Sequence, residues 1–98
     1  MKHLIFKITS CKITAPYTLE LRFNDGSCKR INFEKVLHGE MYSPLRNSDF
    51  FGLVTIDPEV FTVVWPNGAD FDPAILHDWE KYEKEMIDRA KGRDVVSK

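Results

Sequence analysis

Two carboxylates beside a turn come closest to a chemical site in this chain. Asp70 and Asp72 alternate with apolar residues directly after a Trp-Pro-Asn-Gly segment, and carboxylate oxygens at such spacing suit a hard cation. The pair lacks the glycine and the distal glutamate that a calcium-binding loop requires at fixed positions. Asp72 precedes Pro73 and can cap a helix, and Asp70 can bond the amides of the turn. We therefore expect structural roles for both carboxylates, and no metal or cofactor site.

Residues that could act as nucleophiles or bases lack neighbours that would activate them. The three histidines, His3, His38 and His77, have no local partner that would orient the ring, and we expect His77 at the surface or half-buried. No serine lies in a nucleophile elbow, and the five glycines are too scattered to form a phosphate-binding loop. The sequence thus predicts no catalytic residue, and we expect a protein that is not an enzyme.

The composition is that of a small folded domain. The chain has 98 residues, of which 43% are hydrophobic and 30% charged, and its formal net charge of -1 gives no overall attraction for nucleic acid. The N-terminal apolar run is too short for a signal peptide, and no run approaches the roughly 18 apolar residues that span a bilayer. Cys11 and Cys28 lack the spacing of zinc and redox sites. We expect a cytoplasmic protein with reduced thiols and no membrane contact.

The clearest strand pattern lies in the first third of the chain. Residues 17–23 alternate apolar and polar side chains, and the Asn-Asp-Gly that follows predicts a turn. A three-residue loop with Gly26 in the left-handed conformation sets Leu19 opposite Ile31, whereas a two-residue turn would mix the two faces. The strand before this hairpin keeps a single buried face only if it contains a bulge near Thr9 and Ser10.

A second hairpin is expected around an Asp-Pro-Glu-Val loop. Pairing Ile56 with Phe61 also brings Val54 opposite Val63, which predicts a four-residue loop. Val64 points to the other face and is apolar as well. This strand is therefore expected inside the sheet and not at its edge.

Helix signals are strongest in the last third. Two short helices are expected between the hairpins, one capped by Asn32 and one by Ser48. A long amphipathic helix should begin with Asp72 as its cap and Pro73 in its first position, and should end near Gly92. Its apolar face comprises Ile75, Leu76, Trp79, Tyr82, Met86, Ile87 and Ala90.

These elements predict an α+β fold with an antiparallel β-sheet of four or five strands, short helices and one long C-terminal helix. We expect one compact domain. Residues 1–72 should form its α+β sheet part, and residues 73–98 its C-terminal amphipathic helix and tail.

Basic residues in the first third raise the question of nucleic-acid binding. The aromatic residues between them, Tyr17, Phe23 and Phe33, fall on the inward face of the predicted hairpin, so they are core residues and not platforms for stacking bases. Trp65 is open to two interpretations, a core residue or an exposed binding anchor. The basic residues are Lys2, Lys7, Lys12, Lys29, Arg30 and Lys35.

Three segments carry a resemblance to a known family. Residues 16–26 (PYTLELRFNDG), Pro44 to Phe51 with its Pro-Leu-Arg and Asp-Phe-Phe elements, and Trp65 to Asp70 (WPNGAD) resemble the bacterial and phage family called domain of unknown function 2442. The resemblance covers roughly residues 1–77 and implies a small α+β domain with an antiparallel sheet. The family has no established activity or catalytic residues. Its members often occur beside another small uncharacterised protein, as in toxin-antitoxin pairs, and some are joined to a helix-turn-helix domain. The long C-terminal helix expected here shows no recognisable helix-turn-helix.

We therefore expect a small interaction module, an antitoxin-like or regulatory partner of a neighbouring protein. Trp65, Asn67, Gly68 and Asp70 form the family motif. Tyr82, Met86 and Ile87 could project past the sheet and bind a partner protein or a second copy in a homodimer. In the alternative, the whole apolar face of the helix is buried within one monomer. The runner-up function, which the aromatic pattern disfavours, is a nucleic-acid-binding regulatory domain that uses a basic patch.

Overall fold

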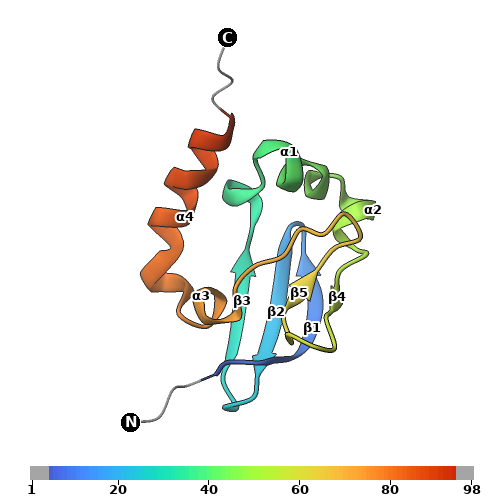
Figure 1. The fold of residues 1–98 in the computed structure, drawn as a ribbon, viewed down its shortest axis with the longest axis vertical. Coiled ribbons are helices and arrows are strands. Elements are labelled where there is room, and N and C mark those ends of the chain that lie inside the picture. The colour runs from blue at the N-terminus through green and yellow to red at the C-terminus, as the bar shows by residue number, and fades with distance from the viewer. Residues whose placement is uncertain (1–4, 95–98) are drawn as a thin grey trace.

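Three strands form an antiparallel sheet in the order β1-β2-β3 (Figure 1). The computed structural model describes residues 5–94, so Lys2, His3 and the tail from residue 95 lie outside the description. The strands are β1 (Ile8–Ala15), β2 (Thr18–Phe23) and β3 (Cys28–Asn32).

The hairpin of β2 and β3 has the predicted register. Leu19 lies opposite Ile31, and Gly26 has a left-handed φ of 87°. The carboxylate of Asp25 accepts the N–H of Ser27 at 2.9 Å, which fixes the loop. The three-residue loop and the buried face of this hairpin are thus confirmed.

The predicted bulge in β1 is also confirmed. Ile8 pairs with Phe23 but Ser10 pairs with Arg22, so Thr9 is the extra residue. The bulge lets Ile8 enter the core although the rest of β1 follows the other phase.

The second hairpin forms a separate two-stranded sheet of β4 (Thr55–Ile56) and β5 (Val63–Val64). Ile56 pairs with Val63. Both predicted pairs of this hairpin, Ile56 with Phe61 and Val54 with Val63, are therefore wrong by two residues.

The loop of this hairpin explains the error. The N–H of Asp57 donates to the carbonyl of Thr62, and the N–H of Phe61 donates back to the carbonyl of Asp57, each at 2.9 Å. Phe61 has a left-handed φ of 56°, so it leaves the strand. Its carbonyl instead accepts the N–H of Ile8 at 2.8 Å and ties the loop to β1. We expected β5 inside a larger sheet, and this prediction is wrong, because among the described strands β5 pairs only with β4 in a two-stranded sheet. Its second edge is covered by a bridge between residues 64 and 70.

Four short helices connect the two sheets, where the sequence predicted two. They are η1 (Glu34–Val36), α1 (Gly39–Tyr42), η2 (Ser43–Arg46) and α2 (Ser48–Phe51). Asn32 contributes the expected bond, because its Oδ1 accepts the N–H of Glu34 at 2.8 Å. The cap of α2 is Asn47 and not Ser48. Asn47 has the extended backbone that a cap requires, and its Oδ1 accepts the N–H of Phe50 at 3.0 Å.

The C-terminal part is helical as predicted but contains a break. Asp72 caps α3 (Pro73–His77) by accepting the N–H of Ala74 at 2.8 Å. Asp78 then leaves the helical conformation, with φ -108° and ψ 42°, and α4 follows (Trp79–Asp94). The prediction of one uninterrupted helix is therefore wrong. The break turns the chain so that Leu76 of α3 and Trp79 of α4 both reach the core.

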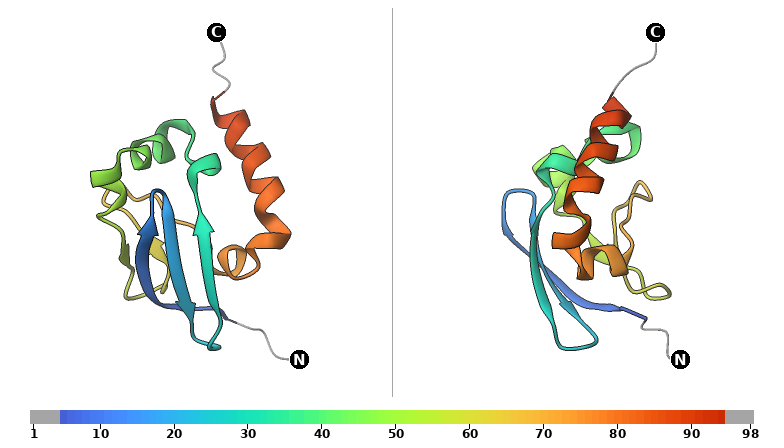
Figure 2. Two further views of the ribbon diagram at one scale, coloured as in Figure 1. Left: turned by 180° about the vertical axis from the view of Figure 1, so that it is seen from behind. Right: turned by 90° about the vertical axis from the view of Figure 1, so that its left-hand side faces the viewer.

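The helices and the second sheet lie on one face of the three-stranded sheet, as Figure 2 shows in its right-hand view. Phe33 is the centre of the aromatic core between these layers, with ring centroids of Phe71 and Trp79 at 4.9 and 5.9 Å. Phe23 and Phe33 are buried as predicted, and Tyr17 is half-buried. The predicted α+β class, with five antiparallel strands, short helices and a long C-terminal helix, is thus confirmed.

Both cysteines are free thiols, as expected. Cys11 is half-buried, and burial raises the pKa of its thiol, whereas Cys28 is exposed. Within residues 5–94, no helix is long and apolar enough to cross a membrane.

Candidate functional site

Trp65 is a core residue, which decides between the two roles considered for it. Its side chain is 2% exposed, and its indole N–H donates to the carbonyl O of Phe51 at 2.9 Å. Phe33 and Phe71 contact the ring at centroid distances of 6.4 and 6.0 Å. The aromatic residue of the family motif therefore fastens α2 to the end of β5.

Asn67 and Gly68 form the turn after this strand. The N–H of Gly68 donates to the carbonyl of Trp65 at 2.9 Å, and Gly68 has a left-handed φ of 88°. Oδ1 of Asn67 accepts the N–H of Ala69 at 3.1 Å, while Nδ2 donates to the carbonyl of Met41 at 2.8 Å. Asn67, and not Asp70 as expected, thus bonds the turn amide, and it also fastens the turn to α1.

Asp70 contributes its backbone to the fold, because its carbonyl accepts the hydroxyl of Tyr42 at 2.8 Å. Its side chain is exposed, and Asp72 is engaged as the cap of α3. Across the described residues, no three His, Cys, Asp or Glu side chains lie close enough to hold a metal ion. The segment from Trp65 to Asp72 therefore contributes turn, cap and packing contacts to the fold.

The predicted apolar stripe of the C-terminal helix is only partly open. Tyr82, Met86 and Ile87 are half-buried, and the last two pack against the core. The ammonium of Lys81 lies 5.6 Å from the centre of the Tyr82 ring. The exposure of these three side chains is therefore intermediate between the two predicted alternatives, a free apolar stripe and full burial.

A more exposed apolar surface surrounds α2. We call Ile13, Pro44, Phe50 and Leu53 the α2 surface. Ile13 and Leu53 are 45% and 55% exposed, which is high for large apolar side chains. A methyl group added at Gly52 would lie 3.8 Å from Cδ1 of Ile13. Ile13 of β1 is therefore next to the end of α2, and the two form one continuous surface.

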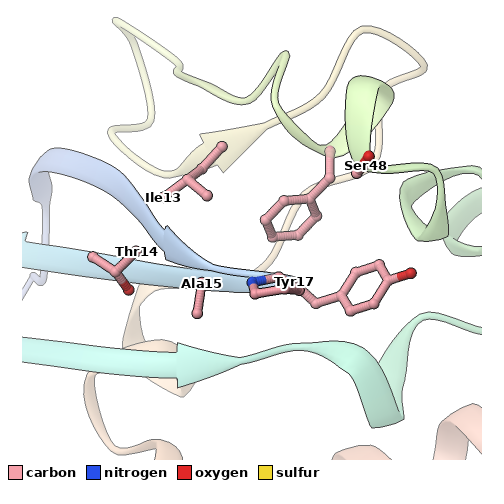
Figure 3. Close-up of a pocket in the computed structure, with 7 residues that line it drawn as sticks. Ile13, Thr14, Ala15, Tyr17 and Ser48 are labelled. Carbon is pink, nitrogen blue, oxygen red and sulfur yellow. The ribbon is translucent and has the colours of Figure 1, made fainter.

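The first of two hollows lies between the β1–β2 turn and α2 (Figure 3). Its volume is about 260 Å³, and its lining is mostly apolar. The ring of Tyr17 contacts Phe51 edge-on at 6.1 Å, and the hydroxyl of Tyr17 donates to the carbonyl of Arg46 at 2.8 Å. These contacts hold the walls in place. The lining residues are Ile13, Thr14, Ala15, Pro16, Tyr17, Ser48 and Phe51.

The second hollow lies on the other side of α2. It is wider and more open, with a volume of about 570 Å³, and is lined by Pro44, Asn47, Asp49, Phe50 and Leu53. Asp49 is the acidic residue of this lining, and it is exposed. The two hollows together could accept apolar side chains on either side of a short helix, with a carboxylate beside the second.

The basic residues that the sequence singled out are divided among several places, as far as residues 5–94 show. Lys29 forms an ion pair with Glu80 at 2.7 Å, and Lys7 lies over an aromatic ring at 4.7 Å from its centre. Lys12 and Arg30 point outward from the uncovered face of the sheet, with a glutamate between them. This dispersal weakens the case for a nucleic-acid interface.

One histidine does acquire partners, contrary to expectation. His77 lies between two carboxylates, with Nε2 2.7 Å from Oδ2 of Asp25 and Nδ1 2.9 Å from Oδ1 of Asp78. Burial of the ring tends to lower the pKa of His77, but the hydrogen bonds and charges of the two aspartates outweigh it and raise that pKa. Because both ring nitrogens are occupied, neither is available to accept a proton from a substrate.

Sequence reasoning missed the α2 surface and the histidine cluster for different reasons. The α2 surface gave no periodic signal, because Leu53 is a single apolar residue in a connecting segment. The histidine cluster could not be found, because Asp25 and His77 are 52 positions apart.

A family model described as protein of unknown function (DUF2442) matches residues 8–82. This match confirms the resemblance that the three sequence segments indicated. Comparison with curated proteins and with solved structures finds no similar chain.

Proposed function

We propose that this chain, which belongs to the DUF2442 family, is a non-enzymatic module that binds a partner protein through the α2 surface. The observation that carries the proposal is the pair of apolar hollows on either side of α2, next to Ile13 and Leu53, which are about half exposed. Exposed apolar groups that adjoin hollows are typical of protein-binding surfaces.

The chemistry of the surface indicates the kind of partner. Apolar side chains suit both hollows, and a lysine or arginine suits the exposed carboxylate of Asp49 at the rim of the second. We therefore propose a partner segment with two apolar side chains and one basic residue. The finer role, an antitoxin-like or regulatory partner of a neighbouring protein, is supported only by the family resemblance.

The C-terminal helix is the weaker candidate for this role. Met86 and Ile87 already pack against the core and Tyr82 is half-buried, so a partner would gain less apolar area there than at Leu53. A Met86→Glu, Ile87→Glu variant would also place charges against the core and confuse loss of binding with loss of folding.

A photo-crosslinking experiment tests the proposal. A photoreactive phenylalanine analogue replaces Leu53 in one variant and Val60 in another, and crosslinked proteins from the native host are identified. Val60 is the matched control, since it is 59% exposed but lies on the β4–β5 loop at the far end of the hairpin from α2 (Figure 1). The identified partner is then purified and its dissociation constant measured by calorimetry.

We expect Leu53→Glu to weaken binding by about 30-fold or more, because a charge would enter an apolar contact, whereas Val60→Glu should bind like the parent chain. Equal affinities for the two variants would contradict the α2 surface. The crosslinked protein could instead be a second copy of this chain. If the Leu53→Glu variant then sediments as a monomer, the α2 surface is the interface of a homodimer and not the binding site of another protein.

Nucleic-acid binding remains the second candidate because of the uncovered face of the three-stranded sheet. Lys12, Arg22 and Arg30 point outward there, against the single carboxylate of Glu20. Binding of this kind should weaken steeply with salt and with Arg30→Gln, whereas binding at the α2 surface should tolerate both.

A further inference from the structure

The two bonds of His77 connect parts of the chain that are distant in sequence. Asp25 lies in the β2–β3 loop, and Asp78 is the residue at which α3 ends and α4 begins. The ring thus joins the tip of the β2–β3 hairpin to the junction between α3 and α4. Oδ1 of Asp25 is fixed in turn by the hydroxyl and the N–H of Ser27, at 2.6 and 2.9 Å.

The arrangement requires a protonated ring. An ionised carboxylate can only accept hydrogen bonds, so each ring nitrogen must carry a hydrogen to bond its aspartate. Only the imidazolium has hydrogens on both nitrogens. In a neutral ring, one nitrogen would direct a lone pair at a carboxylate oxygen 2.7 or 2.9 Å away, and that contact would become repulsive.

Aromatic neighbours keep the ring in this position. Phe6 stacks on it with centroids 3.8 Å apart, and Phe23 meets it edge-on at 5.0 Å. The side chain is 17% exposed. Because the ring is held between these neighbours, it cannot turn a nitrogen toward water without losing the stacking on Phe6.

A second ion pair lies beside the cluster. Glu80, in the first turn of α4, is paired with Lys29 of β3 at 2.7 Å, and its charge also acts on His77. The charged groups that face the ring are therefore Asp25 from the hairpin loop, Asp78 from the helix junction and, farther away, Glu80 with Lys29. Their sum is negative, which favours the imidazolium.

We infer that His77 is a proton-controlled clamp, which holds the α3–α4 junction against the β2–β3 loop when the ring is charged and loosens it when the ring is neutral. The backbone at Asp78 is already outside the helical conformation, so the junction is the point at which the two helices can separate. Deprotonation would break the contact with Asp25 or with Asp78 and free this junction first.

The sign of the pH dependence follows from the direction of the shift. A folded-state pKa raised above the ordinary 6.5 of histidine gives stability that is complete below pH 6.5 and is lost as the pH rises through the folded value. The bonds from Ser27, and then that from His77, lower the pKa of Asp25 to about 2. The carboxylate of Asp25 therefore stays charged down to about pH 3.

Nuclear magnetic resonance of the whole chain tests the clamp. The ring nitrogen shifts of His77 are followed between pH 5 and pH 9, and the protection of amides 74–82 against hydrogen exchange is measured at the same pH values. We expect a pKa above 6.5 and both nitrogens protonated below it. Protection of these amides, corrected for intrinsic exchange, should fall as the ring titrates, by tenfold for each unit of the shift.

Variants separate the clamp from a general effect of pH. Asp25→Asn should lower the pKa of His77 and flatten the protection profile, and since Asp25 is at an exposed loop this variant should fold. His38→Gln, which removes another histidine, should keep the parent profile. An unshifted pKa in the parent, or a profile that is the same in Asp25→Asn as in the parent, would overturn the proposal.

Discussion

Replacing Trp65 by Phe gives a direct measure of what the motif tryptophan does. The substitution removes part of a side chain that is only 2% exposed. The lost packing should lower the free energy of unfolding by about 2 kcal/mol, roughly half the loss expected for truncation to Ala. It also removes the N–H that donates to the carbonyl of Phe51. That carbonyl keeps a longer bond from the N–H of Val54 at 3.3 Å, so the lost hydrogen bond should add only about 1 kcal/mol. The expected total is about 3 kcal/mol.

Urea and thermal denaturation followed by circular dichroism measure this loss. Trp79→Phe is the matched control, because Trp79 is also buried in the aromatic core but its indole N–H has no acceptor among the described residues. The control should lose about 2 kcal/mol, and the two variants should differ in melting temperature by about 4–8 °C. Equal losses would show that the bond to Phe51 contributes nothing. A fully stable Trp65→Phe variant with weakened partner binding would refute the structural role altogether.

Two further pairs of variants test local features of the backbone. Asn47→Ala should lower the free energy of unfolding by about 1 kcal/mol, because it removes the cap of α2. Ser48→Ala should change it by less than about 0.5 kcal/mol in the same urea titration. Gly68→Ala should lower it by about 1–2 kcal/mol, since φ is 88° although no atom lies within 4 Å of the added methyl. Gly92→Ala, in α4, also has open space around the added methyl and should raise it by up to about 1 kcal/mol.

The sequence predicted those parts of the fold that depend on neighbouring residues. The register of Leu19 and Ile31 followed from alternation and from one glycine, and both act over a few residues. The cap at Asp72 was equally local. The second hairpin failed because the left-handed backbone of Phe61 is stabilised by its bond to Ile8, and no local pattern contains that bond.

The candidate sites depended still more on distant contacts. A helical period cannot reveal that Asp78 interrupts the helix, since the apolar spacing continues through it. The apolar period at Tyr82, Met86 and Ile87 fitted both a free stripe and full burial. Only the packing of η1 and α1 against α4 decides how much of the stripe is covered. Leu53 was not singled out because a single apolar residue in a connecting segment has no period.

The ties between the motif turn and the short helices bear on the order in which the chain acquires its structure during synthesis. Residues 39–51 are held by the indole of Trp65, the amide of Asn67 and the carbonyl of Asp70, all of which are translated later. The hairpin of β2 and β3, in contrast, contains its own partners. We therefore expect a nascent chain that ends before Trp65 to form the first hairpin while α1 and α2 stay unformed. The α2 surface would then become available to a partner only after the turn at Asn67 and Gly68 has left the ribosome.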